Sequence, residues 1–413
     1  MLEQIVIVGV GQAAVQAIDT LRRKGFAGKL IAVGDEPWAA YQRPPLSKKY
    51  LAGTVDRDRL AIRPPSFYSE RNVDLRLGRA AVAIDRTAQR VRLDDGSELA
   101  YDGLLLTTGS RPRTLSLPGG LRGQGPDLPG VYYLRTIADV DQLRQHLAPG
   151  RRLVVVGGGY IGLEVAATVR ELGMEVTVLE MADRVMNRVT CKTVSEFFTT
   201  THSRHGVRIV CNATVRAIAA DEETGRVRAV VTQDGAEYPA DVVIVGIGVV
   251  PVDELAAAAG LACANGIVVD EHCRTSDPAI FAAGDCTSHP SPRYGRRLRL
   301  ESVDNAFEQA TSAACNLLGL PTPHDKVPWF WSDQYDIKLV IVGLTHDHDV
   351  VITRGDPSSA CFSACYLRQG ELVAIDSVNS PKDQMAARKL IAERVRPDVT
   401  KLTNPAIPLR DSV

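Results

Sequence analysis

The chain of 413 residues lacks the features of several protein classes. No apolar run reaches the roughly 18 residues that a transmembrane helix requires. The 48 lysines and arginines nearly balance the 49 aspartates and glutamates, so no overall charge draws the chain to nucleic acid or to a membrane surface. The first residues, MLEQIVIVGVGQ, enter a predicted strand without a basic leader. We therefore expect a soluble, cytoplasmic protein with no nucleic-acid or membrane partner.

Cysteine is present, but never as a C-x-x-C pair and never before position 191. We expect the eight cysteines to be single reduced thiols in the core or at the surface. Cys361 and Cys365 lie in ACFSACY, whose alternation predicts a strand. Residues four apart on a strand share a face but are too far apart to form a disulfide.

The strongest positive signal is the stretch 151–184. A buried-strand run, 153–156, leads into Gly157, Gly159 and Gly162, which are spaced G-x-G-x-x-G, and a helical pattern follows. This order predicts a dinucleotide-binding βαβ unit. The first glycine permits a tight turn, the second lets the backbone approach a pyrophosphate, and the third lets helix and strand pack closely. The helix N-terminus then faces the negative charge of the ligand.

The acid that follows this unit indicates which nicotinamide cofactor it binds. A second strand, 176–179, ends in Glu180, about twenty residues after the glycines. A carboxylate at this position accepts hydrogen bonds from a ribose 2′-OH and would repel a 2′-phosphate. The sequence therefore predicts NADH rather than NADPH.

A second fingerprint occupies residues 3–35. Its loop contains Gly9 and Gly11, but Ala14 replaces the third glycine, a permitted variant that loosens the packing slightly. The acid at the end of the second strand is Asp35 or Glu36. Two such folds imply two dinucleotides, and the usual pair is FAD first and a nicotinamide second.

The remaining pattern indicates a discontinuous first domain. With 45% hydrophobic residues, the chain can build cores for two or three domains. An apolar strand runs into TTGSRPR, where we expect the chain to leave the first domain. A Gly/Pro-rich linker is expected at 116–130, and VGIGVVP resembles the motif at which the chain leaves the first domain. We expect an FAD domain at 1–115 and 248–325, an NADH domain at 116–247 and a C-terminal domain at 326–413. The C-terminal domain is expected to contain short strands and one helix, 382–393.

The combined motifs resemble the FAD-dependent, NADH-using ferredoxin reductases of bacterial oxygenase systems. The resemblance implies the α/β fold of glutathione-reductase-like flavoproteins, with two Rossmann-like dinucleotide-binding domains and an α+β C-terminal interface domain. The stretches that carry it, in family order along nearly the whole chain, are YQRPPLSKKYLAG, LLLTTGSRPR, YYLRT, GGGYIGLEVAA, VGIGVVP, TSDPAIFAAGDC, RLRLESVDNAFEQA and PWFWSDQYDIKL.

The same resemblance implies a set of cofactor-binding residues. Within the FAD set, the first loop would hold the pyrophosphate, Asp35 would stand at the adenosine ribose, and Val82 would contact adenine through its backbone. Asp285 would hold the ribityl chain, and Val303 and Trp331 would border the flavin. The full FAD set is Gly9, Gly11, Ala13, Ala14, Asp35, Arg43, Lys48, Val82, Arg113, Arg135, Gly284, Asp285, Val303 and Trp331. The NADH set is Gly157, Gly159, Tyr160, Ile161, Gly162, Glu180 and Gly248.

Lys48 and Glu164 are the candidate catalytic residues. The resemblance places Lys48 beside the flavin near N5, where a cation stabilises the reduced, anionic ring. Glu164, one helical turn past the glycines, would pair with Lys48 and hold it in place. The alternatives are a solvated surface lysine and an exposed helix glutamate.

The expected electron acceptor follows from where sulfur is missing. The stretch 42–48 contains no cysteine, so a flavin there cannot hand electrons to a protein thiol and must pass them outward singly. The resemblance implies a two-iron two-sulfur ferredoxin, usually acidic, that serves a monooxygenase or ring-hydroxylating dioxygenase. The basic residues that could steer its docking, or could equally form a solvated face, are Arg293, Arg296, Arg297, Arg299, Lys382, Arg388 and Lys389.

Two other functions remain open from the sequence. An NADH oxidase of the same fold would pass electrons to dioxygen, although the missing cysteine argues against a water-forming type. A nucleotide-bound signalling flavoprotein would reduce its flavin slowly. We expect a monomer.

Overall fold

The computed structural model describes residues 2–117, 128–346 and 348–413. The chain forms two compact units, the first comprising Met1–Gln42, Arg57–Arg111 and Val249–Pro328, and the second Arg43–Asp56, Pro112–Gly248 and Trp329–Val413. The short segment 43–56 therefore clusters with the second dinucleotide fold, and so does the C-terminal region. The finer division into three domains stays a prediction.

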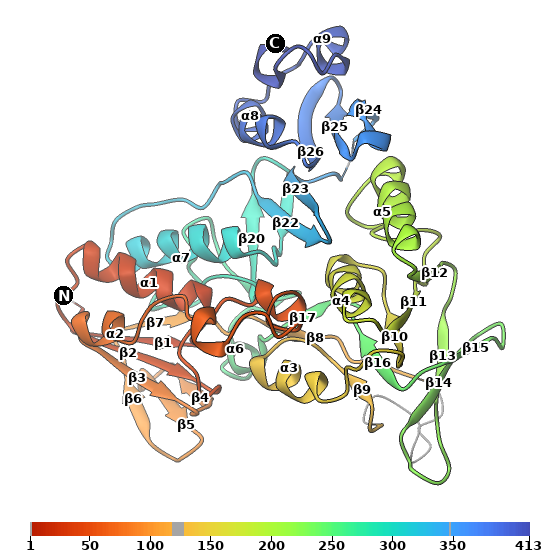
Figure 1. Cartoon of the computed structure of the whole chain (residues 1–413). Helices are drawn as coiled ribbons and strands as arrows, with labels where there is room; N and C mark the ends of the chain where they lie inside the picture. Colours follow the sequence, from red (N-terminus) through yellow and green to blue (C-terminus); the bar gives the residue numbers. More distant parts are fainter. Residues whose placement is uncertain (1, 118–127, 347) are drawn as a thin grey trace. The chain divides into compact units, whose positions relative to one another are not determined.

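A five-stranded parallel sheet forms the centre of the first unit. Its strands, in spatial order, are β19 (Ile280–Ala282), β7 (Gly103–Leu106), β1 (Gln4–Val8), β2 (Lys29–Gly34) and β3 (Val73–Leu77). The middle strands are runs of buried valine, isoleucine and leucine, as expected for a sheet covered on both faces. Helices α1 (Gln12–Arg23) and α7 (Val303–Leu317) pack side by side on one face (Figure 1).

Smaller elements complete the first unit. Three antiparallel strands form one sheet, three short strands form another, and a two-stranded sheet joins the two chain exits. These elements are β4 (Ala81–Asp85), β5 (Arg90–Leu93) and β6 (Glu98–Ala100); β18 (Ile267–Val268), β20 (Thr287–Ser291) and β21 (Arg296–Leu298); β8 (Ser110–Pro112) and β17 (Val249–Pro251); and η2 (Arg57–Leu60), α2 (Ser66–Glu70) and α6 (Glu254–Ala258).

Two histidines are buried together in the first unit. His289, on β20, contacts His324 edge to face, with 4.8 Å between the ring centroids. His324 Nε2 lies 3.2 Å from Asn305 Oδ1. Burial lowers the pKa of His289 to about 3 and that of His324 to about 4. Both imidazoles are therefore neutral at physiological pH.

The second unit repeats the same plan. Its parallel sheet, in spatial order, contains β12 (Arg208–Val210), β11 (Glu175–Leu179), β10 (Arg152–Val156), β16 (Val242–Val245) and β9 (Val131–Tyr132). The helices of this fold are α3 (Ile137–Arg144), α4 (Tyr160–Glu171) and α5 (Lys192–Arg204), and an antiparallel meander consists of β13 (Val215–Ala220), β14 (Val227–Thr232) and β15 (Glu237–Pro239). The short helix η1 (Pro44–Ser47) packs against α4.

An antiparallel sheet forms the C-terminal part of the second unit. Its strands, in spatial order, are β22 (Trp329–Gln334), β23 (Ile337–Gly343), β26 (Glu371–Val378), β25 (Cys361–Arg368) and β24 (Val350–Asp356). The helices are η3 (Pro357–Ser359), α8 (Pro381–Ala392), α9 (Val399–Thr403) and η4 (Leu409–Asp411). The helix expected at 382–393 thus corresponds to α8.

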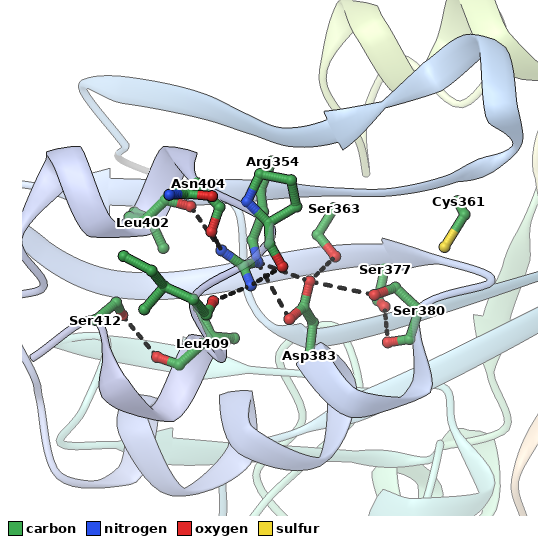
Figure 2. A network of polar contacts seen from close by, with 12 residues as sticks. Arg354, Cys361, Ser363, Ser377, Ser380, Asp383, Leu402, Asn404, Leu409 and Ser412 are labelled. Carbon is green, nitrogen blue, oxygen red and sulfur yellow. Dashed lines mark hydrogen bonds and ion pairs between the residues drawn. The ribbon is translucent and has the colours of Figure 1, made fainter.

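A buried arginine fastens the end of the chain to this sheet (Figure 2). The side chain of Arg354, on β24, is 3% exposed, and its Nε lies 3.1 Å from Asp383 Oδ2 of α8. The remaining guanidinium N–H groups donate to the carbonyls of Leu402, Asn404, Pro405 and Ile407. The hydroxyls of Ser363 and Ser380 donate to the same carboxylate. Because each buried charge is paired and hydrogen-bonded, the cost of desolvating it is offset.

A second buried carboxylate lies between the nucleotide fold and the C-terminal sheet. Asp376, on β26, is fully buried, and its Oδ2 accepts hydrogen bonds from Tyr366 and from Thr190 Oγ1, the latter at 2.6 Å. Burial raises the pKa of Asp376 to about 7, although the hydrogen bonds from Thr190 and Tyr366 act in the opposite direction. This carboxyl group therefore titrates near neutral pH.

The cysteines, the predicted linker and the apolarity of the helices can be compared with the expectations from the sequence. All eight cysteines are free thiols, and Cys361 and Cys365 both lie on β25 as the alternation predicts. Most of the predicted linker 116–130 lies outside the described residues. Within the described ranges, no helix is long and apolar enough to cross a membrane.

Candidate active site

The loop between β1 and α1 is shaped to approach a ligand. Gly9 has a φ of +100°, and a Cβ there would lie 2.3 Å from the carbonyl oxygen of Thr107, so a side chain is excluded. Gly11 is the N-cap of α1, and a Cβ there would meet nothing within 4 Å. No side chain caps this helix start. The first N–H groups of α1 are therefore available to an anion.

Further predicted FAD residues surround this loop in the first unit. Ala13 and Ala14 are buried in α1, and a Cβ added to Gly284 would lie 3.5 Å from that of Ala13. Asp285 Oδ2 accepts a hydrogen bond of 2.8 Å from Ser110. Val303 is the first residue of α7. The structure thus gathers the loop and the segment 284–285 at one end of the sheet.

Two residues of the predicted FAD set lie in more open positions. Asp35 is exposed just past β2, whereas the neighbouring Glu36 accepts a 2.5 Å hydrogen bond from the hydroxyl of Tyr41. Val82, on β4, is 48% exposed. The structure gives neither of them a partner in the glycine loop, and their roles stay predictions.

The corresponding loop of the second unit is more tightly constrained. Gly157 has a φ of +108°, and a Cβ there would lie 2.4 Å from the carbonyl oxygen of Gly246. A Cβ on Gly162 would lie 2.1 Å from the carbonyl oxygen of Gly157. Gly159, the N-cap of α4, faces open space and has no capping side chain. The first and third glycines are thus required by packing, and the second leaves room for a phosphate.

Glu180 is tied to this loop. Its Oε2 accepts a hydrogen bond of 2.7 Å from the backbone N–H of Gly158, and its Oε1 accepts one of 2.8 Å from that of Ala182. Both oxygens retain lone pairs, because an ionised carboxylate has about four acceptor sites. The carboxylate is therefore held where a ribose hydroxyl could donate to it.

The remaining residues of the NADH set lie close to the same helix start. Ile161 is 42% exposed and Gly248 is exposed. The carbonyl oxygen of Gly248 accepts a 2.9 Å hydrogen bond from the backbone N–H of Arg113. The ring of Tyr160 lies 4.9 Å from that of Phe330, and burial raises its pKa well above the usual value.

Lys48 and Glu164 form an ion pair inside the second unit. Lys48 Nζ lies 2.6 Å from Glu164 Oε2, and the two side chains are only 17% and 5% exposed. Pro44 and Pro45 start η1, whose end places Lys48, and α4 supplies Glu164. The alternatives of a solvated lysine and an exposed glutamate do not hold, because both side chains are largely buried and paired.

Two serines that the sequence reasoning missed complete the environment of Glu164. Ser47 donates to Oε2 over 2.5 Å, and Ser332 of β22 donates to Oε1 over 2.7 Å. Ser332 and Gln334 are the buried positions of β22, but WFWSDQ has no alternation of apolar and polar residues that would mark them. No sequence pattern predicts that Ser332 contacts Glu164 on α4, because the two residues are far apart in the chain.

Other predicted flavin neighbours lie in the second unit as well. Arg43 donates to the carbonyl oxygen of Arg135 over 2.6 Å. Trp331 is half-buried on β22, and its ring lies 5.4 Å from that of Trp329. Arg113 is exposed. Their roles toward FAD stay predictions.

The candidate basic residues make different contacts. Arg297 donates to the carbonyls of Val269 and Ser288, and Arg299 pairs with Glu301. On α8, Lys382, Arg388 and Lys389 are exposed, as Arg296 and Arg297 are, and Arg388 lies over the ring of Trp329 while Lys389 pairs with Glu393. Both groups therefore present positive charge at the surface.

Comparison with known proteins identifies the family. Residues 3–310 match the pyridine nucleotide-disulphide oxidoreductase family, and residues 329–413 match the reductase C-terminal family. The chain belongs to the pyridine nucleotide-disulphide oxidoreductases. The resemblance to flavoprotein reductases and the mixed α/β fold expected from it are both confirmed.

Its relatives are named as reductases, and two of them as the ferredoxin–NAD(+) reductase components of dioxygenase systems. The chain is 47% identical over 388 residues to rhodocoxin reductase of Rhodococcus erythropolis, covering 94% of this chain and 89% of that protein. It is 42% identical to putidaredoxin reductase of Pseudomonas putida, covering 100% and 97%. The structure resembles the reductase in the covalent putidaredoxin reductase–putidaredoxin complex with a TM-score of 0.94, over 98% and 97% of the two chains at 42% identity.

Both glycine loops fit the dinucleotides that this family implies. Each loop combines a turn that only glycine can make with an open N-cap and an uncapped helix start. In the part of the chain that the structure describes, no group of three or more histidine, cysteine or acidic side chains is placed to hold a metal ion.

Proposed function

We propose that this chain is an FAD-dependent NADH:ferredoxin reductase of an oxygenase system. The observation that carries the proposal is the buried Lys48–Glu164 pair beside an open nucleotide loop, in a family member whose relatives reduce the ferredoxins of such systems. FAD, when bound, accepts a hydride from NADH and releases electrons one at a time.

The residues of the first unit are assigned to FAD. The uncapped start of α1 and the open Gly11 hold the pyrophosphate. Asp285, oriented by Ser110, receives hydroxyl groups of the ribityl chain. These residues bind and orient the cofactor, and they move no proton.

The residues of the second unit are assigned to NADH and to the reacting ring. Gly159 admits the pyrophosphate, and Glu180 accepts from the ribose 2′-OH, which favours NADH over NADPH. Lys48 provides a positive charge that stabilises the reduced cofactor electrostatically. Glu164 holds that ammonium group in place through a contact of 2.6 Å.

The acceptor is proposed to be an acidic two-iron two-sulfur ferredoxin that docks against the basic face of α8. Lys382, Arg388 and Lys389 are exposed there, and opposite charges on the two partners would raise the association rate at low salt. We propose a monomeric, cytoplasmic enzyme. Its eight free thiols are consistent with a reducing compartment.

The direct test is NADH-driven cytochrome c reduction by the FAD-loaded protein, with and without putidaredoxin as the probe ferredoxin. We expect turnover that depends on the ferredoxin and falls as salt is added. The triple variant Lys382→Gln, Arg388→Gln, Lys389→Gln should raise the KM for ferredoxin with little change in NADH-driven flavin reduction. Rapid NADH consumption without ferredoxin, and no stimulation by putidaredoxin, would support the oxidase alternative instead.

A further inference from the structure

A line of polar side chains runs from Glu164 through β22 to α5. Ser332 Oγ lies 2.7 Å from Glu164 Oε1, and Gln334 Nε2 lies 3.1 Å from Ser332 Oγ. His202 Nε2 lies 2.8 Å from Gln334 Oε1, and the hydroxyl of Tyr335 lies 3.4 Å from His202 Nδ1. Ser332 and His202 are 0% exposed and Gln334 is 1% exposed. All five residues belong to the second unit.

The carboxylate at one end sets the direction of every bond in this line. Glu164, ionised beside Lys48, can only accept, so the single hydroxyl proton of Ser332 must point to it. Ser332 then accepts from the amide N–H of Gln334, which turns the amide oxygen toward His202. His202 must therefore carry its proton on Nε2, and its Nδ1 accepts from Tyr335.

The state of His202 agrees with this direction. Burial lowers the pKa of His202 to about 4, so the imidazole is neutral at physiological pH and has one N–H donor and one acceptor. Ionisable groups also lie near the line: His205 acts on His202, and Glu171 and Arg170 act on Tyr335. A neutral ring with this tautomer is the form that the line of hydrogen bonds requires.

The far end of the line is held by a strained residue. Tyr335 lies in the turn between β22 and β23 with a φ of +56°, a left-handed conformation that is unfavourable for a non-glycine residue. Its ring stacks on that of His205, with 3.7 Å between centroids and 9° between planes. The strain is tolerated at a position where the side chain anchors the hydroxyl next to His202.

We propose that Ser332, Gln334 and His202 are positioning residues that hold the Glu164 carboxylate, and through it the Lys48 ammonium group, in the reactive geometry. A buried carboxylate without donors is costly, and three donors, Ser47, Lys48 and Ser332, share the two oxygens of Glu164. Loss of Ser332 frees Oε1, so the carboxylate can rotate and the ammonium group can follow it. The inference rests on the proposed function, because it assigns Lys48 to the reacting cofactor.

The line also connects the C-terminal sheet to the reaction. Ser332 and Gln334 are the two buried positions of β22. This strand belongs to residues 329–413, which match the reductase C-terminal family. The orientation of Glu164 therefore depends on a strand outside the nucleotide fold that supplies Glu164 itself.

The first experiment observes the line without any turnover. Histidine labelled with ¹⁵N is incorporated into the FAD-loaded protein, and the signals of His202 are assigned by their loss in His202→Gln. We expect a neutral ring protonated on Nε2 at every pH from about 5 to 8. A ring protonated on Nδ1, or one that becomes charged within this range, would overturn the inference.

The second experiment measures NADH-driven flavin reduction by stopped flow. Ser332→Ala should slow the rate constant by roughly tenfold, because one of three donors to a buried carboxylate is lost, while the Kd for NADH changes little. The FAD midpoint potential should become more negative as the ammonium group moves. Gln334→Leu should have a smaller effect of the same kind, roughly threefold.

Matched variants separate this role from a merely structural one. Ser332→Thr keeps the hydroxyl and should restore the rate to within about twofold of the original. Ser377→Ala removes another buried serine of the same sheet, one whose hydroxyl donates to the carbonyl oxygen of Ser380, and should leave rate and potential unchanged. If Ser332→Ala folds, binds FAD and reduces it at the original rate and potential, the positioning role is refuted.

The two hypotheses fail in different ways. Absence of ferredoxin-dependent turnover in the unaltered protein would reject the proposed function, whatever the tautomer of His202. Normal turnover of the unaltered protein, together with the wrong tautomer of His202 or with an unchanged rate and potential in Ser332→Ala, would reject only the positioning line.

Discussion

The two glycine loops have the same layout but different tolerances. Both helices contain 12 residues and both begin after a glycine N-cap. In the first unit the third position is Ala14, a buried residue with a real Cβ. In the second it is Gly162, where a Cβ would lie 2.1 Å from a backbone carbonyl oxygen. The second helix therefore packs closer to its loop than the first.

The acidic residues that follow the second strand of each nucleotide fold also differ in their partners. Glu180 is bonded to the backbone of its own glycine loop. In the first unit a Cβ on Gly34 would lie 2.9 Å from Cβ of Val10, so a loop side chain fills this space, and Glu36 bonds Tyr41 instead. Matching sequence fingerprints thus specify the turn and the helix start, while each tertiary neighbourhood decides how the loop is braced.

The largest expected effect concerns the third position of the glycine motif, which is Gly162 in the second unit and Ala14 in the first. Gly162→Ala should lower the free energy of unfolding by about 3 kcal/mol and weaken NADH binding at least tenfold, because the backbone carbonyl of Gly157 cannot move cheaply. Ala14→Gly is the matched change in the first unit and should cost only about 1 kcal/mol, with FAD retained. Urea unfolding and NADH titration measure both. Equal costs would contradict the difference in packing.

The second prediction contrasts buried ionisable groups in the two units. Asp376 has a folded pKa of about 7, raised by burial from an unfolded value near 4. Its contribution to stability is present below pH 4 and is lost as pH rises through 7. Asp376→Asn should therefore stabilise the protein by roughly 2 kcal/mol at pH 8 and little at pH 4. Thermal unfolding across this range checks it, and a benefit that does not depend on pH would count against the assignment.

The first unit should respond to pH in the opposite direction. Burial lowers the folded pKa of His324 to about 4, against an unfolded value near 6.5. Its contribution is present above pH 6.5 and is lost as pH falls toward 4. His324→Gln should therefore reduce the decrease in the free energy of unfolding between pH 6.5 and pH 4 by roughly 1–2 kcal/mol. The same unfolding series measures it, and an unaltered acid limb would show that other groups govern it.

The smallest effect concerns cofactor choice. Glu180→Ala should reduce the NADH/NADPH preference by roughly five- to tenfold, because the acceptor for the ribose hydroxyl and the repulsion of a 2′-phosphate are both lost. Asp35→Ala, the matched change in the first unit, should leave this ratio unchanged. The ratio of kcat/KM values for the two nucleotides decides the matter. A shift with Asp35→Ala but not with Glu180→Ala would exchange the roles of the two folds.

Much of the nucleotide fold could be predicted from local pattern. Glycines at 9, 11, 157, 159 and 162, flanked by apolar runs, specify strand, turn and helix within some thirty residues each, so no distant partner is needed to recognise them. Lys48 and Glu164 could be named only through resemblance, because 116 positions separate them and no local rule joins η1 to α4. Their contact distance, and the burial of both side chains, are visible only in the folded chain.

The sequence by itself determined two dinucleotide folds, the family and the absence of a cysteine beside the expected flavin position, since each of these is carried by residues close together in the chain. Tertiary structure alone decided that Ser332, Gln334 and His202 converge on Glu164, that Glu36 rather than Asp35 bonds Tyr41, and that burial raises the pKa of Asp376. The physical reason is that burial and hydrogen-bond direction depend on which side chains meet across the fold. Period and spacing do not carry that information.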